Sequence, residues 1–214
     1  MFFHNEFYGG DKMVGLRSKK KKITKDKILK ASKELFFTQG YENTTASQIA
    51  EKAEIGVGTV YNYYKSKADI FIANMSQEFE MDEGHEIKYV LDLNQGVADI
   101  VKEFLSKYIG KMKLFPRKLV RELISAAVSS FKNNPNFLNK LMDLDYKLMD
   151  KLEELLNNLK EKGILDEKLD TKITVEVIYS GLMYEFGVYF YDEEYSFDEC
   201  KNNINKKVDF VFRC

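Results

Sequence analysis

Apolar residues recur at every third or fourth position along most of this chain, which is the spacing of one face of an α-helix. The first such segment begins near Thr24, includes Ile28 and Leu35 on its apolar face, and stops at Gly40, because glycine readily ends a helix. From Ser66 onward the same spacing predicts helices at about 67–80, 96–112, 117–132, 136–162, 171–191 and 197–212. Breaks fall at Asp82 to His85, Pro116, Asn133 to Pro135, Lys162-Gly163 and Asp192 to Tyr195. The pattern therefore predicts an all-α protein.

Two short helices are predicted between these longer ones. The first covers about 45–53 and begins at a threonine cap. The second covers about 57–64, with Val60 and Tyr64 one turn apart and facing inward. The turn Glu54-Ile55-Gly56 joins them. A short helix, a tight turn and a second short helix form a helix-turn-helix, whose second helix can enter a DNA major groove.

The helix predicted at 136–162 carries a stripe of leucines with methionines beside it. The stripe comprises Leu141, Leu144, Leu148, Leu152, Leu155 and Leu159. We interpret it as hydrophobic core in preference to a ligand-binding surface, because a long apolar stripe on one helix face is typical of core packing.

Two apolar stripes run along the helix predicted at 171–191, so this helix is expected to be buried on two sides. One stripe comprises Ile173, Val177, Gly181, Tyr184, Val188 and Tyr191, and the other Val175, Ile178, Leu182, Phe186 and Tyr189. At Gly181 the missing side chain would permit close approach of another helix. The last predicted helix adds Phe197, Cys200, Ile204, Val208 and Val211. This much apolar surface suggests a partner, although both helices could instead complete the core of one chain.

Several short motifs follow one another from the first helix onward. They are Ile28-Leu29, Ala31, Leu35-Phe36, Gly40, Thr44-Thr45, Ile49-Ala50, Ala53, Gly58-Thr59-Val60-Tyr61, Tyr63-Tyr64 and Ser66-Lys67. In this order and at these spacings, residues of about 23–71 resemble the DNA-binding region of the TetR (tetracycline-repressor-like) family of transcriptional regulators. Two positions depart from the family pattern: Glu54 stands where the family usually has the turn glycine, and Gly56 where it usually has a serine cap.

The resemblance implies three parts: an N-terminal extension with a basic arm (1–22), a helix-turn-helix DNA-binding domain (23–66), and a helical effector-binding and dimerisation domain (67–214). It also implies a regulator, most commonly a repressor, that binds a palindromic double-stranded DNA operator and is released by a small-molecule effector. The last two helices, about 171–212, would form the homodimer through a four-helix bundle.

DNA binding needs donors for phosphates and side chains that reach base edges. The candidates are Thr45, Ser47, Val57, Gly58, Thr59, Tyr61, Asn62, Tyr63 and Lys67. Thr45 and Lys67 stand at helix starts, which favour anions, and Asn62 can pair bidentately with adenine. By resemblance, the phosphate contacts would come from Thr59, Tyr63 and Lys67, and those nearer the bases from Val57 and Tyr61.

Charge is unevenly distributed although the net charge is only −1. Residues 17–67 hold 12 Lys and Arg against 5 Asp and Glu, a balance of +7, whereas residues 68–214 carry −7. A basic head on an acidic body fits one domain that meets phosphates and another that does not. The basic run Arg17 to Lys22 is interpreted as an arm that neutralises DNA phosphates, with a solubilising tail as the alternative.

The acidic part is rich in aromatic residues and methionine, which could line an apolar effector site. The candidates are Phe104, Tyr108, Met142, Tyr146, Met149, Tyr179, Met183 and Glu185. Glu185 lies in an otherwise apolar helix and could pair with a cationic aromatic ligand, which Tyr146 or Tyr179 could stack against. A phosphate-bearing effector is not favoured, because neither clustered arginines nor a glycine-rich loop is present.

Other classes of function find little support in the residues. Cys200 and Cys214 lack a Cys-x-x-Cys spacing, so no disulfide framework is indicated, and neither a metal site nor a cofactor is expected. The apolar stretch from Tyr179 to Tyr191 is too short to span a bilayer and no signal peptide is evident, which indicates a cytoplasmic protein. The alternatives are a helical small-molecule-binding or interaction protein without DNA binding and an all-α enzyme, the latter disfavoured because no catalytic constellation is visible.

Overall fold

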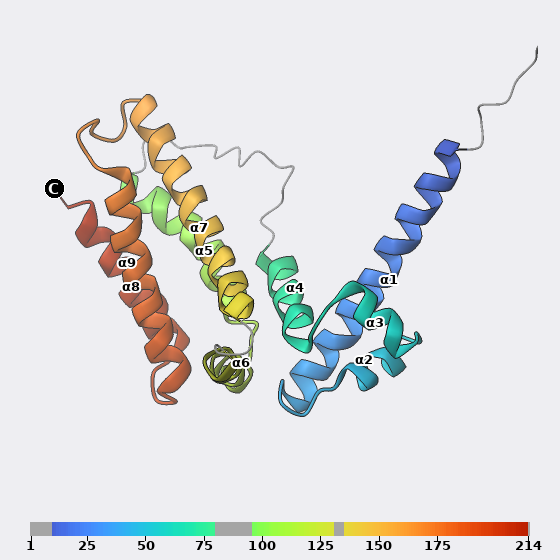
Figure 1. The fold of residues 1–214 in the computed structure, drawn as a ribbon. Helices are drawn as coiled ribbons and strands as arrows, with labels where there is room; N and C mark the ends of the chain where they lie inside the picture. Colours follow the sequence, from blue (N-terminus) through green and yellow to red (C-terminus); the bar gives the residue numbers. More distant parts are fainter. Residues whose placement is uncertain (1–9, 80–95, 131–134, 214) are drawn as a thin grey trace, which may run out of the picture. The chain divides into compact units, whose positions relative to one another are not determined.

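The computed structural model describes residues 10–79, 96–130 and 135–213, which form nine α-helices and no strand within those ranges (Figure 1). The chain divides into two compact units, residues 1–74 and 75–214, so the boundary falls inside one helix. No helix in the described ranges is both long enough and apolar enough to cross a membrane. The predicted breaks at Asp82 to His85 and Asn133-Asn134 lie outside the described residues.

The first unit contains α1 (Gly10–Gln39), α2 (Ala46–Lys52), α3 (Val57–Tyr63) and the first turns of α4 (Lys67–Phe79). The prediction that the first helix begins near Thr24 is wrong, because α1 already starts at Gly10. The basic run 17–22 is therefore part of a helix and its side chains are exposed. Lysine and arginine are good helix formers, but a run without apolar residues has no periodicity that could reveal a helix.

An aromatic cluster joins α1 to α4 in the core of the first unit. The ring of Phe71 lies 5.2 Å from that of Phe36 and 5.8 Å from that of Tyr41, both in edge-on geometry. Ile49 of α2 and Val60 of α3 are fully buried against this layer. Each such side chain contributes about 1.5–3 kcal/mol through burial. Together they fix the two short helices on the longer ones, as the sequence pattern predicted.

Polar contacts also hold α4 on the first unit. Asn74 is buried and donates hydrogen bonds to the hydroxyl of Ser32 on α1 (2.7 Å) and to the carbonyl of Ile70 (3.2 Å). The Ser32 hydroxyl in turn donates to the carbonyl of Leu29 at 2.9 Å. Since buried polar groups without partners are costly, this chain of bonds specifies how α4 sits on α1.

The second unit contains α5 (Val97–Met112), α6 (Arg117–Ser130), α7 (Pro135–Glu161), α8 (Thr171–Tyr191) and α9 (Phe197–Val211). These bounds lie within two residues of the predicted ones. α8 and α9 form a helical hairpin, against which α5, α6 and α7 pack (Figure 1). α9 opens with a capping box in which Ser196 and Glu199 bond each other's backbone N–H groups.

The two apolar stripes of α8 have different surroundings. The stripe that includes Ile178 and Leu182 is buried within the unit. The other stripe is largely exposed, at Ile173, Val177, Tyr184 and Tyr191. Gly181 faces Lys207 of α9, since a Cβ atom there would come within 2.8 Å of the Lys207 Cδ. The close approach expected at Gly181 is thus made inside one chain.

A buried polar network ties α8 to α9. Glu185 is only 3% exposed, and its carboxylate accepts hydrogen bonds from the Lys207 amine and the Tyr195 hydroxyl. The Tyr195 hydroxyl also accepts a bond from the Asn203 amide at 2.7 Å. Burial, with the bond to Glu185, raises the pKa of Tyr195 to about 12. Cys200 is fully buried beside the network, and burial followed by the Glu185 charge raises the pKa of its thiol to about 12.

Candidate nucleic-acid interface and effector region

The start of α2 is fixed by a reciprocal cap. The Thr45 hydroxyl accepts a hydrogen bond from the backbone N–H of Gln48 (3.2 Å), while the Gln48 side chain accepts one from the Thr45 N–H (2.9 Å). Thr44 is instead buried, with its hydroxyl bonded to the Gly40 carbonyl at 2.7 Å. Thr45 is therefore the cap, and it stays exposed at a helix N-terminus, where a phosphate would find backbone donors.

The turn between α2 and α3 contains a left-handed residue. Glu54 has φ of +56°, although side chains are disfavoured there by about 1–2 kcal/mol. Glu54 thus takes a backbone conformation that glycine adopts without penalty. Gly56 is the N-cap of α3 and provides no side-chain hydrogen bond, so the first N–H groups of α3 lack a side-chain cap.

The inward and outward faces of α3 separate as predicted. Val60 and the following residue Tyr64 are buried, whereas Val57, Gly58, Tyr61 and Asn62 are exposed. Tyr61 is 55% exposed, and the space around Gly58 is open to beyond 4 Å. Thr59 and Tyr63 are half-buried at the margins of this face. Ser47 on α2 is also exposed, so all of these candidates except Thr59 and Tyr63 are exposed to solvent.

Lys67 has a partner that the sequence does not reveal. Its amine donates hydrogen bonds to the backbone carbonyls of Tyr41 (2.6 Å) and Glu42 (3.3 Å) and lies 4.3 Å from the centre of the Tyr41 ring. The lysine thereby ties the start of α4 to the loop that precedes α2. Carbonyl partners carry no side-chain signature, so sequence reasoning assigned Lys67 to DNA phosphates alone.

Positive charge extends farther along α1 than the predicted arm. Arg17 and every lysine from Lys19 to Lys30 are exposed on this helix. On α2, Lys52 pairs with Glu34 of α1 at 2.8 Å, and this pair lowers the pKa of the Glu34 carboxyl. The periodic placement of Lys27 and Lys30 outside the apolar face could have shown that the basic surface continues past residue 22.

The effector candidates do not form one group. Phe104 is completely buried and Tyr108 nearly so, with the Tyr108 ring 4.9 Å from that of Phe79 and 6.3 Å from that of Phe186. Met142 and Tyr146 are exposed, whereas Met149, Tyr179 and Met183 are half-buried. Glu185 is bonded to Lys207 and Tyr195 and so already has partners of its own.

Sequence reasoning missed Asp145, around which three of the tyrosine candidates meet. The Tyr179 hydroxyl of α8 and the Asp145 carboxyl of α7 lie close enough to influence each other's pKa. Burial and this carboxylate raise the pKa of Tyr179, and burial together with the Asp145 charge raises that of Tyr108 on α5. Tyr146 lies close enough to add to the effect on Tyr179. The available signal was Asp145's position in the leucine stripe, between Leu141 and Leu148.

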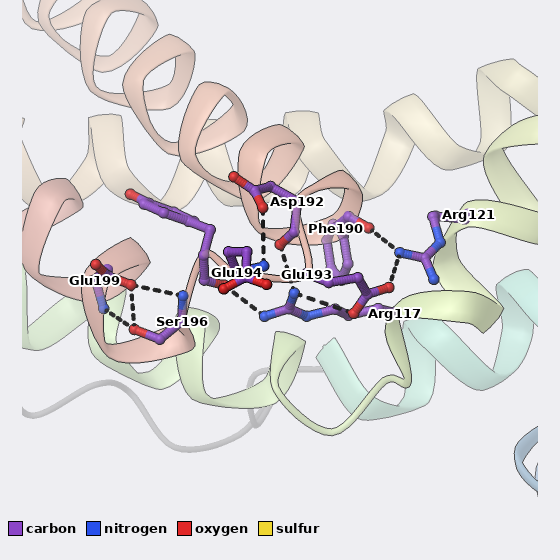
Figure 2. Close-up of polar contacts among 9 residues, drawn as sticks. Arg117, Arg121, Phe190, Asp192, Glu193, Glu194, Ser196 and Glu199 are labelled. Atoms are coloured by element: carbon purple, nitrogen blue, oxygen red, sulfur yellow. Dashed lines mark hydrogen bonds and ion pairs between the residues drawn. The ribbon is translucent and has the colours of Figure 1, made fainter.

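Another contact set connects α6 with the end of α8 (Figure 2). The guanidinium of Arg117 donates to the carbonyls of Asp192 and Tyr195, and that of Arg121 donates to the carbonyl of Phe190 at 2.8 Å. Arg121 also pairs with the Glu193 carboxylate at 2.7 Å. The partners of Arg121 thus lie in the last turn of α8 and in the segment that joins α8 to α9.

Comparison with known proteins agrees with this geometry. The family model described as "Bacterial regulatory proteins, tetR family" matches residues 28–73. The HTH-type transcriptional regulator TcmR of Streptomyces glaucescens is 39% identical over 62 residues, which cover 29% of this chain and 27% of TcmR. The uncharacterized HTH-type regulator YvkB of Bacillus subtilis is 25% identical over 142 residues, which cover 66% of this chain and 70% of YvkB.

The fold is also shared over most of the chain. The TetR-family repressor FadR of Thermus thermophilus, solved in complex with lauroyl-CoA, superposes with a TM-score of 0.62 at 18% identity, covering 87% of this chain and 92% of FadR. The helix-turn-helix of the first unit, together with the helical second unit, defines the class of protein as a transcriptional regulator. Over residues 28–73, the DNA-binding region of the chain is that of the TetR family of bacterial regulatory proteins. The predictions of an all-α fold and of this family are confirmed.

Proposed function

We propose that this regulator binds a palindromic DNA operator as a homodimer and leaves it when a small molecule binds in the second unit. The observation that carries the proposal is the outward face of α3, where Val57, Tyr61 and Asn62 are exposed beside the open space at Gly58. A face that is exposed, uncharged and mounted on buried Val60 suits entry into a major groove.

The phosphate contacts would surround this face. Thr45 and Ser47 are exposed at the start of α2, and the lysines of α1 add a basic surface on the same unit. Such contacts supply affinity for any DNA sequence, while the side chains of α3 choose among sequences. The protein would then act in the compartment that holds the DNA, in agreement with the cytoplasmic location expected from the sequence.

The homodimer would use the exposed apolar stripe of α8. Tyr184 on this stripe is 65% exposed, and the Lys207 amine of α9 lies 5.3 Å from the centre of its ring. Phe210, one helical turn after Lys207, is exposed as well. Together with Ile173 and Val177 these residues form an apolar surface on two adjacent helices, and large surfaces of this kind mark protein–protein interfaces. A dimer would present two α3 helices, which a palindromic operator requires about 34–36 Å apart.

For a ligand to release the protein from DNA, the ligand must bind one conformation of the protein more tightly than the other. The effector must favour a state in which the two α3 helices no longer match successive major grooves. FadR of Thermus thermophilus, which shares the fold, was solved with lauroyl-CoA, and this supports a role for the present chain in binding a small molecule with an apolar part. Whether such a regulator represses or activates depends on where its operator lies relative to the promoter.

The test is selection of DNA by the purified protein followed by fluorescence anisotropy with the selected duplex. We expect an enriched sequence with two inverted half-sites, and binding that weakens steeply with salt, as phosphate contacts require. A library with no enriched sequence, or equal affinity for selected and random duplexes, would reject the proposal. In that case the alternative is a helical ligand-binding protein that has lost DNA binding.

A further inference from the structure

The N-terminal half of α1 is exposed on all sides. From Arg17 to Lys27 every residue except the half-buried Thr24 is exposed, and burial begins at Ile28. Figure 1 shows these turns of α1 running on past α2 and α3 of the same unit. Most helices in proteins are held by packing of an apolar face, and like charges three or four residues apart weaken a helix. A partner that supplies negative charge would therefore stabilise this segment.

Three lysines of α1 lie on one face of the helix. Lys27 follows Lys20 by seven residues and precedes Lys30 by three, which places the three side chains in a row along the helix. All three are exposed. We call Lys20, Lys27 and Lys30 the basic ridge. The ridge is about 15 Å long, because each residue of an α-helix adds about 1.5 Å.

The basic ridge leads to a hollow of about 270 Å³ beside the turn between α2 and α3. The lining comes from one face of α1 and from the end of α2 with the turn: Lys27, Lys30, Ala31, Glu34, Lys52, Ala53 and Glu54. Lys52 pairs with Glu34 at 2.8 Å, which leaves two lysines against one glutamate in the rest of the lining. The hollow therefore offers positive charge to an anionic group.

The course of α2 along α1 places this hollow near the start of α3. The Gln39 amide donates a hydrogen bond to the Gln48 side chain at 3.2 Å, and Lys52 pairs with Glu34, so α2 runs back toward the N-terminus of α1. Three residues separate Glu54 in the hollow from Val57, which begins α3 and is exposed. Beyond the hollow, the ridge continues along α1 for about 10 Å.

We propose that the basic ridge and its hollow bind backbone phosphates of the DNA that flanks the half-site read by α3. The inference rests on the proposed function and extends it, because the contacted DNA becomes longer than the palindrome. A length of about 15 Å matches the rise of about four to five base pairs. Lysine binds phosphates as a point charge, so these contacts would not depend on the flanking sequence.

An anionic membrane is the less suitable partner for this helix. Helices that lie on membranes bury a broad apolar face in the lipid. Between Arg17 and Lys27, Ile23 is the only large apolar residue, so this segment has no such face. The charge pattern therefore favours a polyanion that binds at the surface of the helix without insertion.

Fluorescence anisotropy with duplexes of two lengths tests for flanking contacts. The short duplex ends at the two selected half-sites, and the long one adds about ten base pairs, one helical turn, of random sequence on each side. We expect wild type to bind the long duplex at least about tenfold more tightly, because phosphate contacts are added at each half-site. Changing the sequence of the added base pairs should leave the affinity unchanged.

Two variants of equal charge separate the ridge from general electrostatic attraction. The ridge variant carries Lys20→Gln, Lys27→Gln and Lys30→Gln. The control variant replaces three lysines on the other side of α1: Lys21→Gln, Lys22→Gln and Lys25→Gln. On the long duplex, the slope of log affinity against log salt concentration should fall by about 2.7 per half-site in the ridge variant. In the control it should fall by less than about 1, since that side lies about a helix diameter, or one Debye length, farther away.

Thermal unfolding checks that both variants fold, which we expect because the replaced side chains are exposed. If the triple ridge variant does not fold, Lys27→Gln alone decides, with an expected fall in slope of about 0.9 per half-site. Equal slopes for the ridge and control variants, or equal wild-type affinity for the short and long duplexes, would overturn the proposal.

Two further measurements separate the remaining outcomes. Wild-type binding to phosphatidylserine vesicles that the ridge variant loses, with an unchanged salt slope on DNA, would assign the ridge to membranes and reject flanking DNA. If wild type selects an operator without any effect of flank length, only the inference fails. If it selects no sequence at all, the proposed function fails, and the salt slopes on a random duplex still decide whether the ridge contacts DNA phosphates.

Discussion

The guanidinium of Arg117 on α6 donates a 2.7 Å hydrogen bond to the backbone carbonyl of Asp192, the residue that caps the C-terminus of α8. The same side chain donates to the Tyr195 carbonyl at 2.6 Å and lies 4.1 Å from the centre of the Tyr189 ring. A cation at a helix C-terminus is favoured by the helix dipole. α6 therefore holds the turn that sets α9 against α8.

We expect Arg117→Ala to lower the free energy of unfolding of the second unit by about 1.5–3 kcal/mol, because hydrogen bonds from a charged donor to two backbone carbonyls are lost. Urea denaturation followed by circular dichroism would measure the change. The neighbouring Lys118 is exposed, so Lys118→Ala should stay within about 0.5 kcal/mol of wild type. Equal effects of the two variants would show that the Arg117 contacts add nothing to stability.

The buried pair Ser32 and Asn74 makes a second prediction possible. Ser32→Ala removes the acceptor of a buried amide and should destabilise the first unit by about 1–3 kcal/mol. The double variant Ser32→Ala/Asn74→Leu should recover most of this loss, because replacing both partners by apolar groups can be nearly neutral. Thermal unfolding of both variants provides the measurement. A double variant less stable than the single one would contradict this account of the pair.

Because Glu54 has a left-handed backbone conformation, we predict that its replacement by glycine stabilises the protein. Glycine at this position removes a left-handed penalty of about 1–2 kcal/mol but adds about 0.5–1 kcal/mol of unfolded-chain freedom. Glu54→Gly should thus raise the free energy of unfolding by about 0.5–1 kcal/mol. Glu51→Gly, inside α2, is the matched control and should lower it by about 1 kcal/mol. Destabilisation by both glycines would mean that the turn carries no strain.

The proposed dimer interface on the exposed stripe of α8 should not tolerate a charged side chain. Val177 is 53% exposed on α8, and Val177→Glu should convert a micromolar dimer to monomer, because the charge would be buried without a partner. Sedimentation velocity would report the change. Glu154→Lys alters an exposed residue of α7 and should remain dimeric. A wild-type monomer that binds a two-half-site operator tightly would argue against this interface.

Variants of the proposed DNA contacts should fall into two groups, according to whether the side chain meets a base or a phosphate. Asn62→Ala should change preference at particular base pairs, by about 1–3 kcal/mol where the asparagine pairs with adenine. Thr45→Ala should instead weaken binding to all duplexes alike, because it disturbs the cap of α2 and a phosphate contact. Thr45→Ser keeps the capping hydroxyl and should restore binding. Repeated selection with each variant checks the expectation; an unchanged consensus for Asn62→Ala would remove that residue from base recognition.

Local periodicity predicted most helices well, because amphipathic spacing and caps are encoded in neighbouring residues. The bounds of α8 agree with the prediction, since Asp170 caps its start and apolar residues run through to Tyr191. The start of α1 could not be predicted, because its lysine run has no apolar face. The exposed positions of α3 followed from the burial of Val60, although their contacts with DNA stay a prediction.

Partnerships across long sequence separations could not be predicted. The carbonyl partners of Lys67 and Arg117 belong to the backbone, so any residue type could stand at those positions. Glu185 was taken for a ligand contact because the sequence does not show that Lys207 reaches it from the next helix. Asp145 was overlooked because a leucine stripe was interpreted as a whole, without asking why one of its positions is acidic.

The burial of Cys200 gives the α8–α9 hairpin a chemical reporter. Only a thiolate reacts readily with alkylating reagents, and this thiol is both inaccessible and held protonated by its surroundings. Modification at Cys200 must therefore wait for the two helices to separate. The rate of modification would follow the local opening equilibrium of the hairpin. The thiol therefore reports how readily the two helices that we assign to the dimer separate.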